Sequence, residues 1–314
     1  MRKAKEVLAL ALWIICTVGS YSQTIKPFAK LETPGELRFA VVCDGGQRVV
    51  GVAGEHDLYE WSLPSARRRA VPAIDGHVTL ASCGKGLAIG YRSGTVLVLD
   101  DAENERRRIE MKSDLAAVAL SADGDLVAVA TYNTPLDVWD VASGKLLWSG
   151  STDFGNTGAI GIAPDRNLIV AADGDTHVRA YDGKGKLIYS SDSGLLEPFD
   201  VSLSADAKEF AVAGAEGTIE LHDSATGKVL KKSGNSGNPI FGVMTAAEGA
   251  KVLALELDVH SLEPAGIGYW ETSDPKIKNL AVEPKSVIGM GKGETGLLLV
   301  RKEGPGRIIV ERVE

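Results

Sequence analysis

The chain has 314 residues, of which 44% are apolar, 24% are charged and only 6% are aromatic. This composition excludes a disordered, collagen-like or coiled-coil protein and supplies enough apolar residues for a large core. The formal net charge of −8 disfavours nucleic acid and anionic lipid surfaces as partners, because phosphate groups repel a net acidic protein.

Residues 1–22 have the order of a secretory signal peptide. Basic residues at the start precede an apolar run over residues 7–18, and two serines, Ser20 and Ser22, flank the expected cleavage site before Gln23. An apolar run of about 12 residues is too short for a membrane span, which takes about 20. We therefore expect removal of residues 1–22 on export, which leaves a periplasmic or secreted protein with no membrane span.

The rest of the chain repeats one four-strand pattern about every 40 residues. Residues 115–147 align with residues 199–230, and each copy reads as an apolar strand, an Asp turn, a second apolar strand, an alternating strand, a Gly turn and a final strand. The third strands place the following residues at one register: Trp61, Leu99, Trp139, Tyr181, His222, Trp270 and Glu311. This period and strand number are typical of a β-propeller blade. We predict an all-β, seven-bladed propeller of four-stranded antiparallel blades, in a single domain over residues 23–314.

The strand composition fits this geometry in chain order. First strands crowd the central axis, so they should carry small residues such as Ala116 and Ala117. Second strands lie between two neighbouring blades and should be apolar throughout, as over residues 126–130. Fourth strands form the rim, where bases such as Arg67–Arg69 and Arg106–Arg108 discourage pairing with other molecules. The predicted blades cover residues 36–76, 77–114, 115–156, 157–197, 198–238, 239–283 and 284–314.

The sequence also predicts how the ring closes. The seventh unit stops within three residues of Glu311, so it lacks a fourth strand and would leave an exposed edge. Residues 24–32 precede the first innermost strand and belong to no other blade. We expect this segment to pair beside residues 307–313 and so complete the seventh blade.

The repeats resemble those of the WD-repeat β-propeller family over about residues 36–314. The similarity rests on the turns SADG (121–124), APDR (163–166) and SADA (204–207) and on VWD (138–140). The Gly-His pair that usually opens a WD repeat occurs only at Gly76 and His77. The resemblance therefore implies a degenerate, bacterial-type member whose blades are held mainly by packing.

A second resemblance overlaps the first. DVASGKLLW (140–148) and the related segments at 182–189 and 223–230 look like the repeat of quinoprotein-type propellers. Those propellers include dehydrogenases and envelope assembly scaffolds. The resemblance implies a quinoprotein-like propeller but does not separate an enzyme from a scaffold.

Two cysteines, Cys43 and Cys83, remain after residue 22 and fall at the same turn of adjacent repeats. An oxidising compartment would allow them to pair. A disulfide also needs Cα atoms within about 7 Å, which adjacency of the repeats alone does not secure. Two small buried thiols are the preferred interpretation, and a disulfide is the alternative.

The turns between second and third strands should all emerge on one face of the ring. His56, His177 and His260 fall in such turns, but they belong to blades one, four and six, too far apart for metal bonds of about 2 Å. We therefore expect no metal, no cofactor and no catalytic residue. We predict instead a binding face with these members: His56, Asp57, Tyr132, Asn133, Phe154, Asp173, Asp175, His177, Phe199, Phe241 and His260.

No nucleophile elbow, phosphate loop, paired-thiol zinc motif or HExxH string occurs in the sequence. Loops held on a rigid scaffold commonly carry binding sites. The predicted function is a non-catalytic protein-interaction or ligand-binding propeller, a monomer whose partner is another envelope or extracellular protein. The alternative is a propeller enzyme of the lactonase or quinoprotein type with its site at the channel mouth.

Overall fold

The computed structural model describes residues 24–314 except for residues 75, 152–156, 196, 247–248, 262 and 295. The predicted signal peptide and Phe154 lie outside the described residues. Within the described ranges the chain forms strands and two short 3-10 turns, η1 (Asp44–Gly46) and η2 (Pro284–Ser286). No helical segment in this part of the chain is long and apolar enough to cross a membrane.

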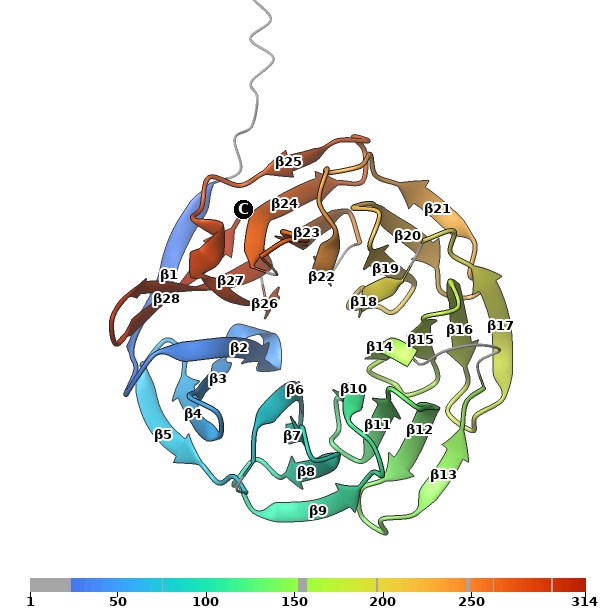
Figure 1. The fold of residues 1–314 in the computed structure, drawn as a ribbon, viewed down its shortest axis with the longest axis horizontal. Coiled ribbons are helices and arrows are strands. Elements are labelled where there is room, and N and C mark those ends of the chain that lie inside the picture. The colour runs from blue at the N-terminus through green and yellow to red at the C-terminus, as the bar shows by residue number, and fades with distance from the viewer. Residues whose placement is uncertain are drawn as a thin grey trace, which may run out of the picture.

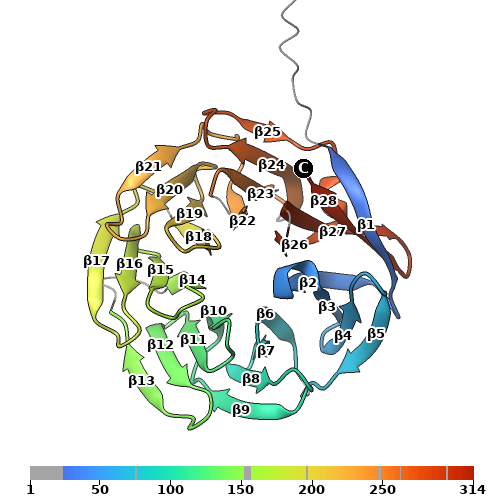
Figure 2. The same cartoon turned by 180° about the vertical axis from the view of Figure 1, so that it is seen from behind.

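Seven four-stranded antiparallel sheets surround a central channel in chain order (Figures 1 and 2), which confirms the predicted seven-bladed propeller. Blades one and two are formed by β2 (Leu37–Cys43), β3 (Arg48–Ala53), β4 (Asp57–Ser62) and β5 (Arg67–Val71), then by β6 (Val78–Gly84), β7 (Gly86–Tyr91), β8 (Thr95–Leu99) and β9 (Glu105–Glu110). Blades three and four are formed by β10 (Leu115–Leu120), β11 (Leu126–Thr131), β12 (Thr134–Asp140) and β13 (Leu146–Ser149), then by β14 (Thr157–Ile162), β15 (Ile169–Asp173), β16 (His177–Tyr181) and β17 (Leu187–Asp192).

Blades five and six are formed by β18 (Pro198–Leu203), β19 (Glu209–Gly214), β20 (Ile219–Asp223) and β21 (Val229–Lys232), then by β22 (Ile240–Thr245), β23 (Lys251–Leu257), β24 (Pro264–Glu271) and β25 (Ile277–Asn279). Blade seven has β26 (Val287–Gly293), β27 (Gly296–Gly304) and β28 (Arg307–Val313), and its fourth strand is β1 (Ile25–Glu32). In every blade the first strand in the order given lies at the channel and the fourth lies at the rim (Figure 1).

The core lies between the blades. Every residue of β11 is buried, because neighbouring blades cover both faces of a second strand. Apolar clusters accordingly join two adjacent blades, as where Val98 of blade two packs with Val127 and Val129 of blade three. At the channel, position 289 of β26 has room only for glycine, since a Cβ there would lie 2.3 Å from the Ala40 carbonyl oxygen. Small residues in first strands therefore allow the blades to meet at the axis.

The ring closes as predicted. β1 pairs antiparallel with β28, from Ile25 opposite Val313 to Glu32 opposite Arg307. Leu31 of β1 is 1% exposed and enters the cluster between blades seven and one. The closing strand therefore contributes both backbone pairing and buried apolar area.

The register of the third strands holds in six blades and fails in the seventh. Trp61 pairs with Val49, the second residue of β3, and the equivalent pair in blade seven is Val313 with Leu297. Glu311 lies two residues earlier in β28 and pairs with Leu299. The assignment of Glu311 to the common register is therefore wrong, because β27 is longer than the second strands of the other blades.

Cys43 and Cys83 form a disulfide, with their Cα atoms 5.5 Å apart. They lie toward the ends of β2 and β6, the innermost strands of blades one and two. The preferred interpretation as two separate thiols is therefore wrong. Periodicity placed both residues at one turn, but only the close packing of the first strands brings the two Cα atoms within bridging distance.

Two charged side chains of first strands, Asp200 and Lys292, make hydrogen bonds to backbone groups near the channel. Asp200 of β18 accepts hydrogen bonds from the backbone amides of Val243 (2.9 Å) and Val201 (2.8 Å), and burial raises the pKa of its carboxyl to about 7. Lys292 of β26 donates to the Leu203 carbonyl oxygen, and burial lowers the pKa of Lys292 to about 8. Lys292 thereby links blade seven to blade five on the inside of the ring.

Candidate functional site

The candidate site is the face on which the turns between second and third strands emerge, which we call the turn face. Because strand direction alternates, the loops from each fourth strand to the next blade open on this face too. Most of the predicted binding residues lie in these turns or beside them: His56, Asp57, Tyr132, Asn133, Asp173, Asp175, His177 and His260. Phe199 and Phe241 are the second residues of β18 and β22 and lie at the same end of their blades.

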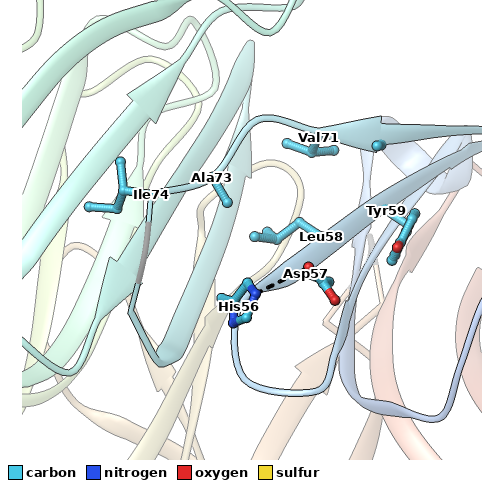
Figure 3. Close-up of a pocket in the computed structure, with 8 residues that line it drawn as sticks. His56, Asp57, Leu58, Tyr59, Val71, Ala73 and Ile74 are labelled. Carbon is cyan, nitrogen blue, oxygen red and sulfur yellow. Dashed lines mark ion pairs between the residues drawn. The ribbon is translucent and has the colours of Figure 1, made fainter.

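A groove opens on the turn face at blade one (Figure 3). It has a volume of about 210 Å³ and is lined by His56, Asp57, Leu58, Tyr59, Ala70, Val71, Ala73 and Ile74. Leu58 and Val71, paired across β4 and β5, supply apolar surface. Nε2 of His56 lies 3.5 Å from Oδ1 of Asp57 at the exposed edge of the groove. This combination suits one small apolar side chain with a polar neighbour.

Blade four carries a buried polar cluster just beneath the turn face. Nη1 of Arg179 lies 2.7 Å from Oδ2 of Asp173, and Nη2 lies 2.8 Å from Oδ2 of Asp175. The Thr157 hydroxyl donates to the other oxygen of Asp173 at 2.5 Å. Burial raises the pKa of Asp173 despite these partners. Burial disfavours the charged form of Arg179, but the hydrogen bonds that its guanidinium donates to both carboxylates outweigh that effect and raise the pKa of Arg179. Asp173 and Asp175, which the sequence places on the binding face, are thus engaged in ion pairs within blade four.

Large apolar side chains project from the turn face. Phe241 is 52% exposed, and its ring centroid lies 5.8 Å from that of Phe199 at the channel edge. Tyr132 is 63% exposed in the turn of blade three, and Val259 is 59% exposed in the turn of blade six. Sequence reasoning missed Val259, although an aliphatic residue between Asp258 and His260 in a turn is a visible signal. The turn face therefore presents apolar contacts on short, well-held turns.

Phe199 and Phe241 occupy the same kind of backbone irregularity at the channel edge. The pairing of β18 with β19 skips Phe199, and the pairing of β22 with β23 skips Phe241, so each residue lies in a β-bulge. A bulge redirects a side chain and commonly occurs at the rim of a binding site. The three predicted histidines do not come together, because His56, His177 and His260 lie in blades one, four and six. The described residues contain no group of three His, Cys, Asp or Glu side chains arranged to hold a metal.

A family model described as outer membrane protein assembly factor BamB matches residues 92–254, just over half of the chain. The chain belongs to this family. The BamB family match runs from the end of β7 in blade two to β23 in blade six and includes the three segments that resemble quinoprotein repeats. It confirms the quinoprotein-like propeller, while the resemblance to WD repeats stays a prediction. The chain matches no individual curated protein.

Proposed function

We propose that the protein is a non-catalytic interaction propeller, exported to the bacterial envelope, whose turn face binds another envelope or extracellular protein. The observation that carries this proposal is the exposure of Tyr132, Phe241 and Val259 on one face of a rigid ring. Aromatic residues are enriched in protein interfaces and contribute a large share of their binding energy. The BamB family description, an outer membrane protein assembly factor, supports a role in an envelope assembly.

Two further features support binding over catalysis. The polar groups of blade four are engaged with one another, since Asp173 accepts from both Arg179 and Thr157. The groove beside His56 has a mixed polar and apolar lining and a volume of about 210 Å³, which suits a single side chain of a partner. Together they describe a surface that recognises shape and apolar contacts.

Site-specific photo-crosslinking in the envelope of intact cells tests this proposal. A benzophenone side chain placed at Tyr132, Phe241 or Val259 should capture one common partner, whereas the same probe at Asp165 on the opposite face should not capture it. Phe241→Ser should weaken purified partner binding by roughly tenfold without changing the thermal unfolding midpoint, since loss of a central apolar contact commonly costs more than 1 kcal/mol. Equal capture from both faces would contradict the proposal.

Ligand screening tests the enzyme alternative directly. A ligand at 100 times its dissociation constant stabilises a protein by about 2.7 kcal/mol. We expect no increase in the unfolding midpoint with divalent metals, a quinone cofactor or sugar lactones. A reproducible increase with one of them would favour the lactonase or quinoprotein type of function.

A further inference from the structure

A second exposed apolar surface lies on the outside of the ring. Of the nine exposed large hydrophobic residues in the described part of the chain, six lie on the outer strands of three consecutive blades. We call these six the apolar rim: Leu146, Leu147, Leu187, Ile188, Val229 and Leu230. Figure 2 shows their strands, β13, β17 and β21, following one another along the edge. Scattered exposed apolar residues are ordinary, but equivalent pairs in three adjacent blades form a patch.

A β-bulge produces each exposed pair. In blade three Trp139 pairs with Leu146 and Val138 pairs with Trp148, so Leu147 has no partner in the ladder. The same shift leaves Ile188 of blade four and Leu230 of blade five unpaired in the ladder. Both members of each pair stay exposed, with between 42% and 48% of their surface accessible. A bulge also hinders the addition of another strand to the edge, so a partner would be recognised through side chains.

In blades three and four, the residue after each pair holds the apolar rim in place. The indole of Trp148 lies against Tyr181, with ring centroids 5.3 Å apart. The Tyr189 hydroxyl donates to the Ser224 carbonyl oxygen of blade five at 3.1 Å. Because these contacts fix the outer strands, a partner would lose little free energy in ordering them.

The other rim strands lack such pairs. Blades one and two carry arginines at this place, and these are engaged with nearby acids. Arg69 lies 2.7 Å from Glu60, and Arg106 lies 3.1 Å from Asp125. The apolar surface is therefore confined to one side of the ring.

A lysine precedes each exposed pair, at Lys145, Lys186 and Lys228. The nearest turn carboxylates accept backbone hydrogen bonds, as where Asp140 accepts from the Ser143 amide at 2.7 Å. Among the described residues, none of these three lysines takes part in an ion pair within 4.0 Å. A second copy of the chain would place lysines opposite lysines, and an anionic membrane would meet a protein of net charge −8. The complementary partner is a segment that carries both aliphatic side chains and carboxylates.

We propose that the apolar rim, with Lys145, Lys186 and Lys228, binds an acidic and aliphatic segment of another protein. The contact is made by side chains and adds no strand to a blade. The rim pairs lie where the outer strands begin, at the end of the blades opposite the turn face. This surface and the turn face can therefore be occupied at the same time.

Selection from a phage library of random peptides on the purified full chain tests this inference. Enriched peptides should combine aliphatic residues with Asp or Glu, and their binding should weaken as salt rises. The double substitution Ile188→Ser with Leu230→Ser should weaken a labelled enriched peptide by roughly tenfold. Lys186→Gln should weaken it with little effect on folding, because among the described residues this side chain has no carboxylate within 4.0 Å and only a longer-range attraction to Asp182. Tyr132→Ser on the turn face is the matched control and should bind the peptide as the parent does.

Several outcomes would overturn the inference. The inference fails if the enriched peptides lack acidic residues, or if the parent enriches no peptides beyond those that the double variant also enriches. It also fails if both rim variants bind the enriched peptide as tightly as the parent does. A dimer in gel filtration that the double substitution dissociates would assign the apolar rim to a second copy. Binding of phosphatidylglycerol vesicles that needs the apolar rim would assign it to a lipid surface.

Discussion

Reduction of the disulfide between Cys43 and Cys83 should remove a large share of the stability of the ring. The bridge joins residues 40 positions apart. In the loop-entropy relation, a closed loop of this length limits the unfolded chain enough to stabilise the native state by about 4 kcal/mol at 25 °C. For a chain of 314 residues this corresponds to a decrease of about 6 °C in the unfolding midpoint.

Urea unfolding followed by tryptophan fluorescence, with and without a phosphine reductant, measures this loss. The reduced protein should unfold at a lower urea concentration, and a Cys43→Ala, Cys83→Ala variant should resemble it and not respond to reductant. Superimposable curves for oxidised and reduced protein would refute the reasoning. They would mean either that the bridge does not restrict the unfolded chain as the loop-entropy relation assumes or that no bridge forms.

Three further predictions follow from closure, core packing and the channel. Deletion of residues 25–32 should remove the fourth strand of blade seven, so that urea unfolding becomes broader and begins earlier; a curve like that of the parent would disprove the closure role. Leu31→Ala should cost about 2–5 kcal/mol in urea unfolding, whereas the exposed control Leu146→Ala should change stability by less than about 0.5 kcal/mol. The raised pKa of Asp200 means that its ionisation opposes folding, so this group lowers stability as pH rises toward about 7. Asp200→Asn removes this titration but turns an amide nitrogen toward one of the two backbone N–H groups, which costs stability at every pH. Its effect on the free energy of unfolding should therefore be more favourable at pH 8 than at pH 4, and an equal effect at both pH values would exclude this cause.

Much of the architecture could be predicted because each strand position has its own chemical requirement. The small residues of β10 and the uninterrupted apolar run of β11 reflect position in the ring, and the unassigned segment 24–32 indicated closure. Glu311 was misplaced because counting residues assumes strands of equal length, and β27 is longer than its counterparts. The disulfide depended on a distance between blades that periodicity does not report.

The candidate surfaces were less accessible from sequence. Which face the turns share follows from strand order, so Tyr132 and Phe241 could be placed. The apolar rim was not recognised, although the Lys-aliphatic-aliphatic pattern at 145–147, 186–188 and 228–230 recurs at one register. Alternation in a regular strand would bury one residue of each pair, and only the bulge, a feature of the backbone, leaves both exposed.

The pairing of β1 with β28 also determines how the ring responds to force. Ile25 lies directly opposite Val313, so tension between these two positions acts on the end of the ladder and opens it one pair at a time, like a zipper. Tension between two blades within the chain would instead have to pull whole sheets past each other. The ring should therefore yield at low force when stretched between β1 and β28, the first and last strands in the sequence, and resist strongly when pulled from elsewhere.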